Sequence, residues 1–341
     1  MAPAGREGAG AAGGGAAPRE AGGAAPPDAG EAPPQATERP PLPPGLVLLV
    51  AVLAMSWAGP LVRLSAAPPL AIAAWRLVLS VAFIAVLGAR TGAFRGVRLP
   101  PREWALAVVS GLLLAGHFWS WIASLSLTTV ASSVVLVSSQ PIFVALLSAG
   151  LLGERAGARE WTGILVGVAG AVLIGWGDFG RGTDALRGDL LAILGALLVS
   201  GYYVIGRRLR QRLGLWAYTG IVYGIAALAL LAAAALTPGV ALVGYPPREW
   251  LIFLALAAGP MMLGHTGVNY ALRYLRAYLA NLAVLGEPVG ATLIAWALPQ
   301  IREVPPLQTL LGGALILGGI TLTAARRRPA APAMDAETGE G

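Results

Sequence analysis

The sequence contains no cysteine and no lysine, and charged residues make up only 12% of its 341 residues. The absence of cysteine excludes disulfides, thiolate nucleophiles and cysteine-bound metal sites. The absence of lysine excludes Schiff-base chemistry and Ser-Lys dyads. Soluble domains carry about 25% charged residues, and this chain is 56% hydrophobic. It has too few charges to cover a water-facing surface, so we expect an integral membrane protein with the lipid bilayer as a partner.

The basic residues are all arginine. There are 24 of them against 17 acidic residues, which gives a formal net charge of +7. In a soluble protein this balance would suggest a nucleic-acid or anionic-surface partner. Here nearly all arginines stand between apolar runs, which is typical of residues that set membrane topology. We therefore expect no nucleic-acid partner.

Apolar segments follow one another between two polar tails. Each is close to the length of about 20 residues that a helix needs to cross about 30 Å of hydrocarbon. The ten segments are 45–64, 69–88, 103–125, 129–151, 160–177, 187–207, 216–236, 249–271, 277–299 and 305–325. Residues 1–44, rich in Ala, Gly and Pro, are predicted to form a disordered tail, and residues 327–341 a second, short polar tail.

The arginines also predict an orientation. With the N-terminus inside, few arginines lie on the outer side, and most lie on the inner side. This asymmetry predicts a multi-pass protein with both tails in the cytoplasm. The all-arginine basic residues and the Ala/Gly/Pro-rich tails suggest a bacterium, so we expect the cell inner membrane. The inner set is Arg6, Arg19, Arg39, Arg90, Arg95, Arg98, Arg102, Arg155, Arg159, Arg207, Arg208, Arg210, Arg212, Arg273, Arg276 and Arg326 to Arg328.

The chain contains an internal repeat. Pro141 in the fourth segment and Pro288 in the ninth are 147 residues apart, and the same offset places Gln140 over Glu287. The repeat divides the membrane part into residues 45–181 and 182–326, with five segments each. Because five is odd, the second half must cross the membrane in the opposite sense. The sequence thus predicts an all-α membrane protein of ten transmembrane helices in two inverted five-helix repeats, a transporter architecture.

At this point the sequence resembles a known family. Ser139-Gln140-Pro141-Ile142-Phe143, followed by Leu151-Leu152-Gly153-Glu154-Arg155, and Gly286-Glu287-Pro288-Val289 in the second half are similar to the EamA-type family of the drug/metabolite transporter superfamily. The resemblance covers residues 45–325 and implies a transporter of small molecules. One motif departs from it. Leu-Gly-Glu recurs only imperfectly after the ninth segment, in Leu298–Glu303, so we expect the outer end of that segment to be shaped differently.

Glu287 is the first candidate for a functional residue, because it lies near the centre of the ninth segment. A central acid costs at least about 2.5 kcal/mol on insertion scales, so it must face protein or water. Pro288 frees a backbone carbonyl one turn earlier, which adds to a polar patch. Two interpretations stay open. Glu287 is either a protonatable group that couples transport or contacts substrate, or an acid hydrogen-bonded between helices.

Other polar side chains could complete a site with Glu287. Gln140 overlies it in the repeat, and the nearby serines either line a cavity or satisfy backbone carbonyls. His117 and His265 could relay protons, but their offset is 148, and one residue corresponds to about 100° of helix rotation, so they need not face equivalent places. Arg76 could bind an anionic group, pair with Glu287, or snorkel to the headgroups. The remaining candidates, each of which could equally be packing, are Trp57, Tyr203 and Asn269.

The favoured function is a secondary transporter, exporting amino acids or related small metabolites by alternating access, with proton coupling and a homodimer left open. No phosphate-binding loop is present, two histidines and one acid on separate segments have no metal-ligand spacing, and we expect no cofactor. The first alternative is an intramembrane enzyme acting on lipid or peptide. The sequence lacks the pair of membrane-embedded aspartates of an aspartyl protease and a serine nucleophile in a Gly-x-Ser-x-Gly motif. We therefore expect that the protein is not an enzyme. The second is a non-transporting scaffold.

The cysteine-free sequence allows a direct test of topology. Single cysteines at Ala25 and Ala333 should react only with membrane-permeant thiol reagents in intact cells, because both tails are expected inside. A cysteine at Thr183, between the halves, should react with impermeant reagents. Labelling of Thr183→Cys only after permeabilisation would contradict the orientation or the number of spans.

Overall fold

The computed structural model describes residues 40–176, 182–304 and 307–324, all within the compact unit Glu38–Gly341. The expected tail 327–341, and the expected tail 1–44 apart from residues 40–44, lie outside these residues. Within the described residues the secondary structure is entirely helical. This agrees with the expected all-α class.

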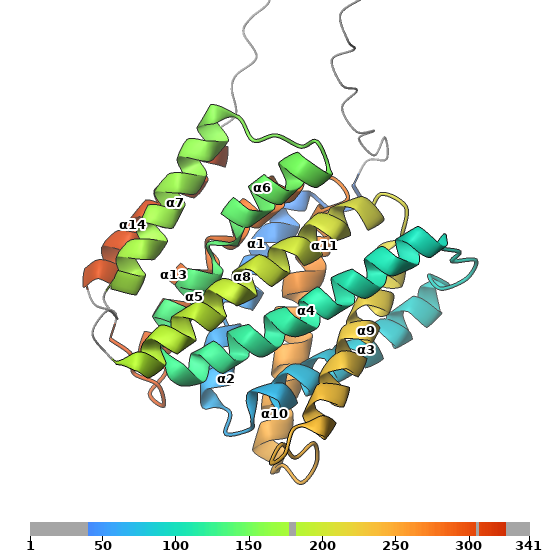
Figure 1. The fold of residues 1–341 in the computed structure, drawn as a ribbon, viewed down its shortest axis with the longest axis horizontal. Helices are drawn as coiled ribbons and strands as arrows, with labels where there is room; N and C mark the ends of the chain where they lie inside the picture. Colours follow the sequence, from blue (N-terminus) through green and yellow to red (C-terminus); the bar gives the residue numbers. More distant parts are fainter. Residues whose placement is uncertain (1–39, 177–181, 305–306, 325–341) are drawn as a thin grey trace, which may run out of the picture. The chain divides into compact units, whose positions relative to one another are not determined.

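The helices follow one another along the chain with short connections (Figure 1). They are α1 (Pro44–Met55), α2 (Ala58–Leu64), α3 (Pro69–Thr91), α4 (Pro101–Leu127), α5 (Val130–Val137), α6 (Gln140–Leu151), α7 (Ala158–Trp176), α8 (Thr183–Leu209), α9 (Leu215–Leu236), α10 (Pro247–Leu256), the π-helix η1 (Ala257–His265), α11 (Thr266–Ala271), α12 (Ala277–Val284), α13 (Glu287–Ala297) and α14 (Leu307–Ala324).

Proline places many of the helix starts. α1, α3, α4 and α10 each begin with a proline at the first helical position, where its missing N–H is not needed and its fixed φ suits the helix. The end of α3 is set by Gly92, which adopts a left-handed conformation with φ of 65°. Glycine reaches that conformation without the steric cost that a Cβ atom adds.

Each of the ten expected segments corresponds to helix in the structure. Eight helical stretches within the described residues are long and apolar enough to cross a membrane: Pro44–Leu64, Pro69–Thr91, Pro101–Leu127, Val130–Leu151, Thr183–Leu209, Leu215–Leu236, Pro247–Ala271 and Ala277–Ala297. The fifth and tenth segments form α7 and α14, which pack against each other. The structure therefore describes a multi-pass membrane protein, and ten crossings remain a prediction.

The fourth and ninth segments are interrupted at matching places. Each break comes directly before a polar residue that is followed by proline. These dipeptides are Gln140-Pro141 at the start of α6 and Glu287-Pro288 at the start of α13. Proline supplies no N–H to the preceding turn and crowds its carbonyl, which breaks the helical ladder there. α5 packs against α13, and α6 against α12. The two broken segments thus run antiparallel, with their breaks at the same level.

The eighth segment contains a π-helix, η1. The segment starts at Arg248-Glu249-Trp250, and Trp250 lies 146 residues after Trp104 in the similar start of α4, whereas Leu272 lies 147 after Leu125. The second copy therefore holds one extra residue. The i→i−5 bond from Thr266 N to Met261 O shows where it is accommodated. Single inserted residues of this kind are absorbed as π-bulges.

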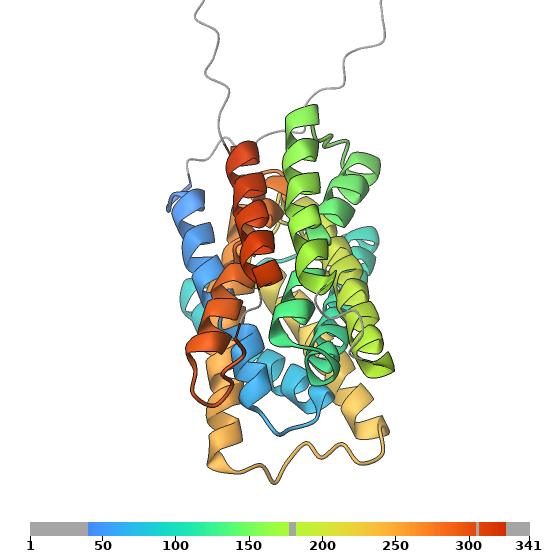
Figure 2. The same ribbon diagram turned by 90° about the vertical axis from the view of Figure 1, so that its left-hand side faces the viewer.

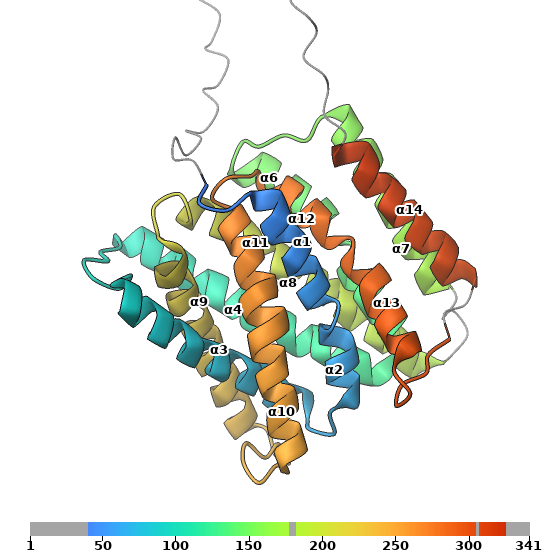
Figure 3. The same cartoon turned by 180° about the vertical axis from the view of Figure 1, so that it is seen from behind.

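Packing between the two halves follows a repeated scheme. α3 packs on α9, and α7 on α14, so that equivalent helices meet. α4 packs along α8, while α1 packs along η1 and α11 in the same relation with the halves exchanged. Figure 3 shows α1 lying beside α11 on the side opposite to that of Figure 1. The scheme has the form expected for two copies related by a pseudo-two-fold axis.

Glycines bring α7 and α14 into backbone contact (Figure 2). A Cβ atom built on Gly170 would lie 2.4 Å from the carbonyl oxygen of Gly312, and one built on Gly319 would lie 2.4 Å from that of Gly163. Small residues allow such close approach between membrane helices. Gly318 differs from these residues, because a Cβ there would meet nothing within 4 Å.

This contrast gives a matched test of packing. Gly170→Ala should lower the stability of the detergent-solubilised protein by about 1–3 kcal/mol, because the added methyl collides with backbone that cannot rotate away. Gly318→Ala, in the same helix pair, should leave it unchanged or slightly raise it. Thermal unfolding of both variants is the measurement. Equal unfolding temperatures for the two variants would contradict the packing described for α7 and α14.

Candidate functional site

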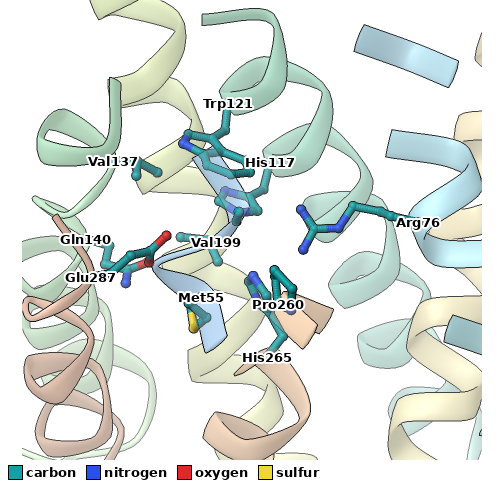
Figure 4. A pocket seen from close by; sticks show the side chains of 11 residues that line it. Met55, Arg76, His117, Trp121, Val137, Gln140, Val199, Pro260, His265 and Glu287 are labelled. Carbon is teal, nitrogen blue, oxygen red and sulfur yellow. The ribbon is translucent and has the colours of Figure 1, made fainter. Parts of the chain in front are cut away.

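A narrow pocket lies at the level of the two helix breaks (Figure 4), and its cavity volume of about 20 Å³ has room for about one water molecule in this conformation. Five of the residues predicted from the sequence line it: Arg76, His117, Gln140, His265 and Glu287. They come from α3, α4, α6, the π-helix and α13. The rest of the wall is formed by Met55, Ala58, Trp121, Val137, Val199 and Pro260. The structure thus gathers polar groups from both halves of the chain around one space.

Glu287 and Gln140 form one wall of the pocket. Each is the first residue of its half-helix and each is only 5% exposed. Figure 4 shows the two side chains next to each other, with the Glu287 carboxylate directed into the pocket. In the part of the chain that the structure describes, this carboxylate makes no ion pair and no hydrogen bond. It is therefore available to a ligand or a proton.

Arg76 forms the facing part of the wall and is 0% exposed. Its Cζ atom lies 4.1 Å from the centre of the Phe118 ring, and Nη2 lies 3.9 Å from Met261 Sδ. Nε and Nη1 have no hydrogen-bond partner among the described residues. A buried guanidinium without a carboxylate is costly to maintain. Full burial excludes snorkelling to the headgroups, and Arg76 makes no salt bridge to Glu287 in this structure, so its donors remain available within the pocket.

The two histidines lie between these walls. Their ring centres are 6.0 Å apart despite the one-residue difference in their offset. His117 Nδ1 lies 2.9 Å from the carbonyl oxygen of Gly195. Because a carbonyl only accepts, Nδ1 carries a proton and Nε2 of the neutral ring is an acceptor. His265 Nδ1 lies 3.1 Å from the hydroxyl of Tyr203. Both rings are thus oriented by groups behind the pocket wall.

The serines near the breaks satisfy backbone carbonyls. Ser138 Oγ donates to Val134 O at 2.7 Å, and Ser139 Oγ to Leu136 O at 2.7 Å. Ser200 Oγ, from α8, donates to the carbonyl of Gln140 at 3.1 Å. None of these serines lines the pocket. The serine hydroxyls therefore support the interpretation that these residues satisfy backbone carbonyls and do not line a cavity.

Three candidate residues lie outside the pocket lining. Tyr203 stands behind His265 and holds its ring. Asn269 Nδ2 donates to the carbonyl of His265 at 2.8 Å and to the hydroxyls of Tyr202 and Tyr223, the latter at 3.1 Å. Trp57 is 45% exposed and lines a separate, apolar groove between α1, α2 and the π-helix. The structure thus assigns Tyr203 and Asn269 to the supporting layer and Trp57 to the outer surface.

Trp121, one of the deeper aromatic residues that the sequence offered as a possible cavity wall, also lines the pocket. Its side chain is buried, and its Nε1 has no hydrogen-bond partner among the described residues. It stacks on His117 with ring centres 6.3 Å apart. The spacing of four residues after His117 was the available signal, because residues one turn apart share a helix face. The pocket therefore holds donors at Arg76 and Trp121 and an acid at Glu287.

Charges of both signs facing one enclosed space can bind a molecule that carries both. A carboxylate or similar anion fits the donors of Arg76, and an ammonium group fits Glu287 with Gln140. Within the described residues no three His, Asp or Glu side chains are grouped to hold a metal ion. Small-molecule binding is the chemistry that this arrangement supports once the walls of the pocket move apart.

Apolar helices long enough to cross a membrane, packed around a pocket of charged groups, define a membrane transporter. The sequence model of the EamA-like transporter family matches residues 44–176 and again residues 186–325. The chain therefore belongs to the EamA-like transporter family, as its motifs indicated. Both the family and the names of similar proteins point to a transporter and not to an enzyme.

Several relatives share most of the membrane part. The uncharacterized transporter YdfC of Bacillus subtilis is 28% identical over 232 residues, which cover 67% of this chain and 74% of YdfC. The aromatic amino acid exporter YddG of Ancylobacter novellus is 31% identical over 234 residues, which cover 62% of this chain and 79% of YddG. A crystal structure of a protein with 26% identity superposes with a TM-score of 0.66 and covers 82% of this chain and 96% of its own.

The contacts of Asn269 predict that it acts on stability. Asn269→Ala should destabilise the protein by about 1–3 kcal/mol, because the hydroxyls of Tyr202 and Tyr223 lose their amide donor in a buried place. Asn281→Ala is the matched control: it is equally buried, but its amide donates only to Ala277 O of its own helix. Thermal unfolding in detergent should show the larger loss for Asn269. The reverse order would contradict the supporting role.

Proposed function

We propose that this protein is a secondary transporter that exports amino acids or related small metabolites by alternating access. The observation that carries the proposal is the pocket, in which the unpaired donors of Arg76 face the unpaired carboxylate of Glu287. An α-amino acid offers a carboxylate to the first and an ammonium group to the second. Among the relatives, YddG is named an exporter of aromatic amino acids, which supports this substrate class.

Ten spans in two inverted repeats are the architecture we propose, with the repeats at residues 45–181 and 182–326. Three observations support it. The family model matches once in each half. Equivalent helices pack on each other, and the contact of α4 with α8 has its counterpart in that of α1 with α11. The broken segments α5–α6 and α12–α13 run antiparallel. Alternating access then consists of rocking the halves about the pocket.

We also propose that both termini are cytoplasmic, in the cell inner membrane. The arginine asymmetry of the connecting segments supports the orientation, and the all-arginine basic residues with Ala/Gly/Pro-rich tails support a bacterial inner membrane. In this orientation the ends of α6 and α8 and the loop between α11 and α12 face the cytoplasm. The ends of α2, α4 and α13 face the outside.

Proton coupling at Glu287 completes the proposal. A carboxyl group that is buried, unpaired and directed into the pocket can hold either a proton or a substrate ammonium group, but not both at once. Competition for one acid links the two fluxes, because loading with substrate from inside requires release of the proton. His117 and His265 lie between Glu287 and Arg76 and provide acceptors along the pocket.

The test is transport in proteoliposomes with a panel of amino acids. Glu287→Gln should keep the fold, because the amide resembles the protonated acid, and should retain counterflow exchange. It should abolish accumulation driven by a pH gradient. Arg76→Gln should lower the affinity for amino acids by about 10- to 100-fold, which corresponds to the loss of a hydrogen bond to a charged group. The affinity for the corresponding amines, which lack the carboxylate, should fall much less.

Asp184→Asn is the control for both variants, since Asp184 forms only an exposed pair with Arg187 in the same helix. It should leave both activities unchanged. Gradient-driven accumulation at the normal rate in Glu287→Gln would reject the coupling role. Equal loss for amino acids and amines in Arg76→Gln would reject the assignment of the carboxylate to Arg76.

A further inference from the structure

A buried ion pair lies at one end of the helices that line the pocket. Arg207 Nε donates to Glu154 Oε1 at 2.9 Å, with side-chain exposures of 8% and 3%. The second carboxylate oxygen accepts the backbone N–H of Ala277 at 3.1 Å, and Arg207 Nη1 donates to the carbonyl of Leu272 at 2.8 Å. These four residues, which we name the Glu154 cluster, join α6, α8, α11 and α12.

A second cluster has the same design. Arg63 Nη2 lies 3.5 Å from Glu303 Oε1, with exposures of 37% and 24%. Glu303 Oε2 accepts the backbone N–H of Val130 at 3.1 Å, and Arg63 Nη1 donates to the carbonyl of Leu125. We name Arg63, Leu125, Val130 and Glu303 the Glu303 cluster. It joins α2, α4 and α5 to the turn after α13.

The members of the two clusters correspond in type and position along the two halves, although the two arginines are 144 residues apart. Leu125 and Leu272, and likewise Val130 and Ala277, are 147 residues apart, which is the offset of the two prolines. Glu303 lies 149 residues after Glu154, so the imperfect motif supplies its acid two residues late. The turn that brings it into place contains Arg302 with φ of 49°, the one positive φ of a non-glycine residue among those described. The end of the ninth segment is thus shaped differently, yet its carboxylate reaches the equivalent position.

Helix ends explain the chemistry of each cluster. The glutamate accepts from the first N–H of a helix, α12 or α5, where the helix dipole is positive. The arginine donates to carbonyls at the end of the preceding helix, α11 or α4, where it is negative. The Glu154 pair therefore joins the connection between α11 and α12, in the second half, to the end of α6 in the first half. The Glu303 pair joins the connection between α4 and α5, in the first half, to the turn after α13 in the second half. Each pair must break if the halves separate at its end.

The clusters lie at opposite ends of the pocket helices. Arg207 follows the pocket residue Val199 by eight residues in α8, or about 12 Å along the axis at 1.5 Å per residue. Arg63 follows the pocket residue Ala58 by five residues in α2. Because equivalent helices of inverted repeats leave the pocket in opposite directions, the two arginines end on opposite sides of it.

We propose that the Glu154 and Glu303 clusters are the two reciprocal gates of the transport cycle. The Glu154 cluster closes the pocket toward the cytoplasm and the Glu303 cluster closes it toward the outside. Each must break in the state in which the pocket opens on its side, while the other stays formed. The proposal rests on the alternating access proposed above. Both pairs are formed in this structure, which is therefore closed at both ends, with the more exposed pair at the Glu303 end.

The gates can be tested by labelling, without any substrate. Val199→Cys places a single thiol in the pocket of a chain that has no cysteine. A membrane-impermeant maleimide is applied to right-side-out and to inside-out vesicles, and the labelling rate is measured from each face. Glu154→Gln in this background should raise the rate from the cytoplasmic face about tenfold and lower it from the outer face, because a buried pair is lost from one state only.

Glu303→Gln should produce the opposite change. Labelling from the outer face should rise by about two- to fivefold, since a half-exposed pair contributes less. Arg207→Gln, alone and together with Glu154→Gln, should shift labelling as far as the single Glu154 variant does, because the two residues act as one pair. Asp184→Asn, which removes an exposed pair confined to α8, should change labelling at neither face.

Reciprocal changes at the two faces support the gates, and a change of equal sign at both faces, or none, overturns them. If Glu154→Gln does not insert stably, Glu303→Gln decides the question alone. The result is separate from the substrate. Reciprocal labelling without amino-acid transport would reject the proposed substrate class and support the gates. Amino-acid transport with unchanged labelling would reject the gates and support the substrate class.

Discussion

In hydrocarbon, every backbone N–H and C=O must find its partner within the protein, and the rest of this structure depends on that constraint. Continuous helix satisfies it without help, and most of the described chain is helix. A break is tolerated only where other groups of the protein supply the missing bonds. Side-chain hydroxyls accompany both breaks: Ser138, Ser139 and Ser200 donate to carbonyls around the first, and Ser56 Oγ lies 3.5 Å from the carbonyl oxygen of Glu287 at the second. Irregular backbone therefore occurs where the two halves meet, and the pocket forms there.

Charge in this protein is placed under the same constraint. Arg76 and Glu287 are buried from opposite walls of the pocket and neither has an ion-pair partner among the described residues. Phe118 gives the guanidinium a partial substitute through its ring face. Under the proposed function, a molecule that carries both charges is preferred to one that carries a single charge, because only the former satisfies both walls. Specificity then follows from desolvated groups that have no other partner.

The ends of the helices complete this arrangement. Where α11 meets α12 and where α4 meets α5, exposed helix ends are covered by a glutamate and an arginine that also bind each other. The same side chains that satisfy backbone groups also connect the halves. One pair is buried and the other half exposed, although their design is shared. The Glu303 pair is reached through a turn that the Glu154 end does not have, in which Arg302 has a positive φ.

The sequence by itself determined that this is an all-α membrane protein, where its helices lie along the chain, and that Gln140 and Glu287 occupy equivalent positions in the repeat. Long apolar runs are readable because only a helix of about 20 residues crosses the hydrocarbon, and the offset of Pro141 and Pro288 revealed the repeat and pointed to Gln140 and Glu287. Only the tertiary structure decided which remaining candidates meet them. The burial of Arg76 under Phe118, the supporting position of Asn269 and the outward position of Trp57 depend on how helices far apart in sequence pack, and one inserted residue such as that in the π-helix turns a face by about 100°. The role of Glu303 was hidden for the same reason, because its turn restores in space a position that the motif had lost in sequence.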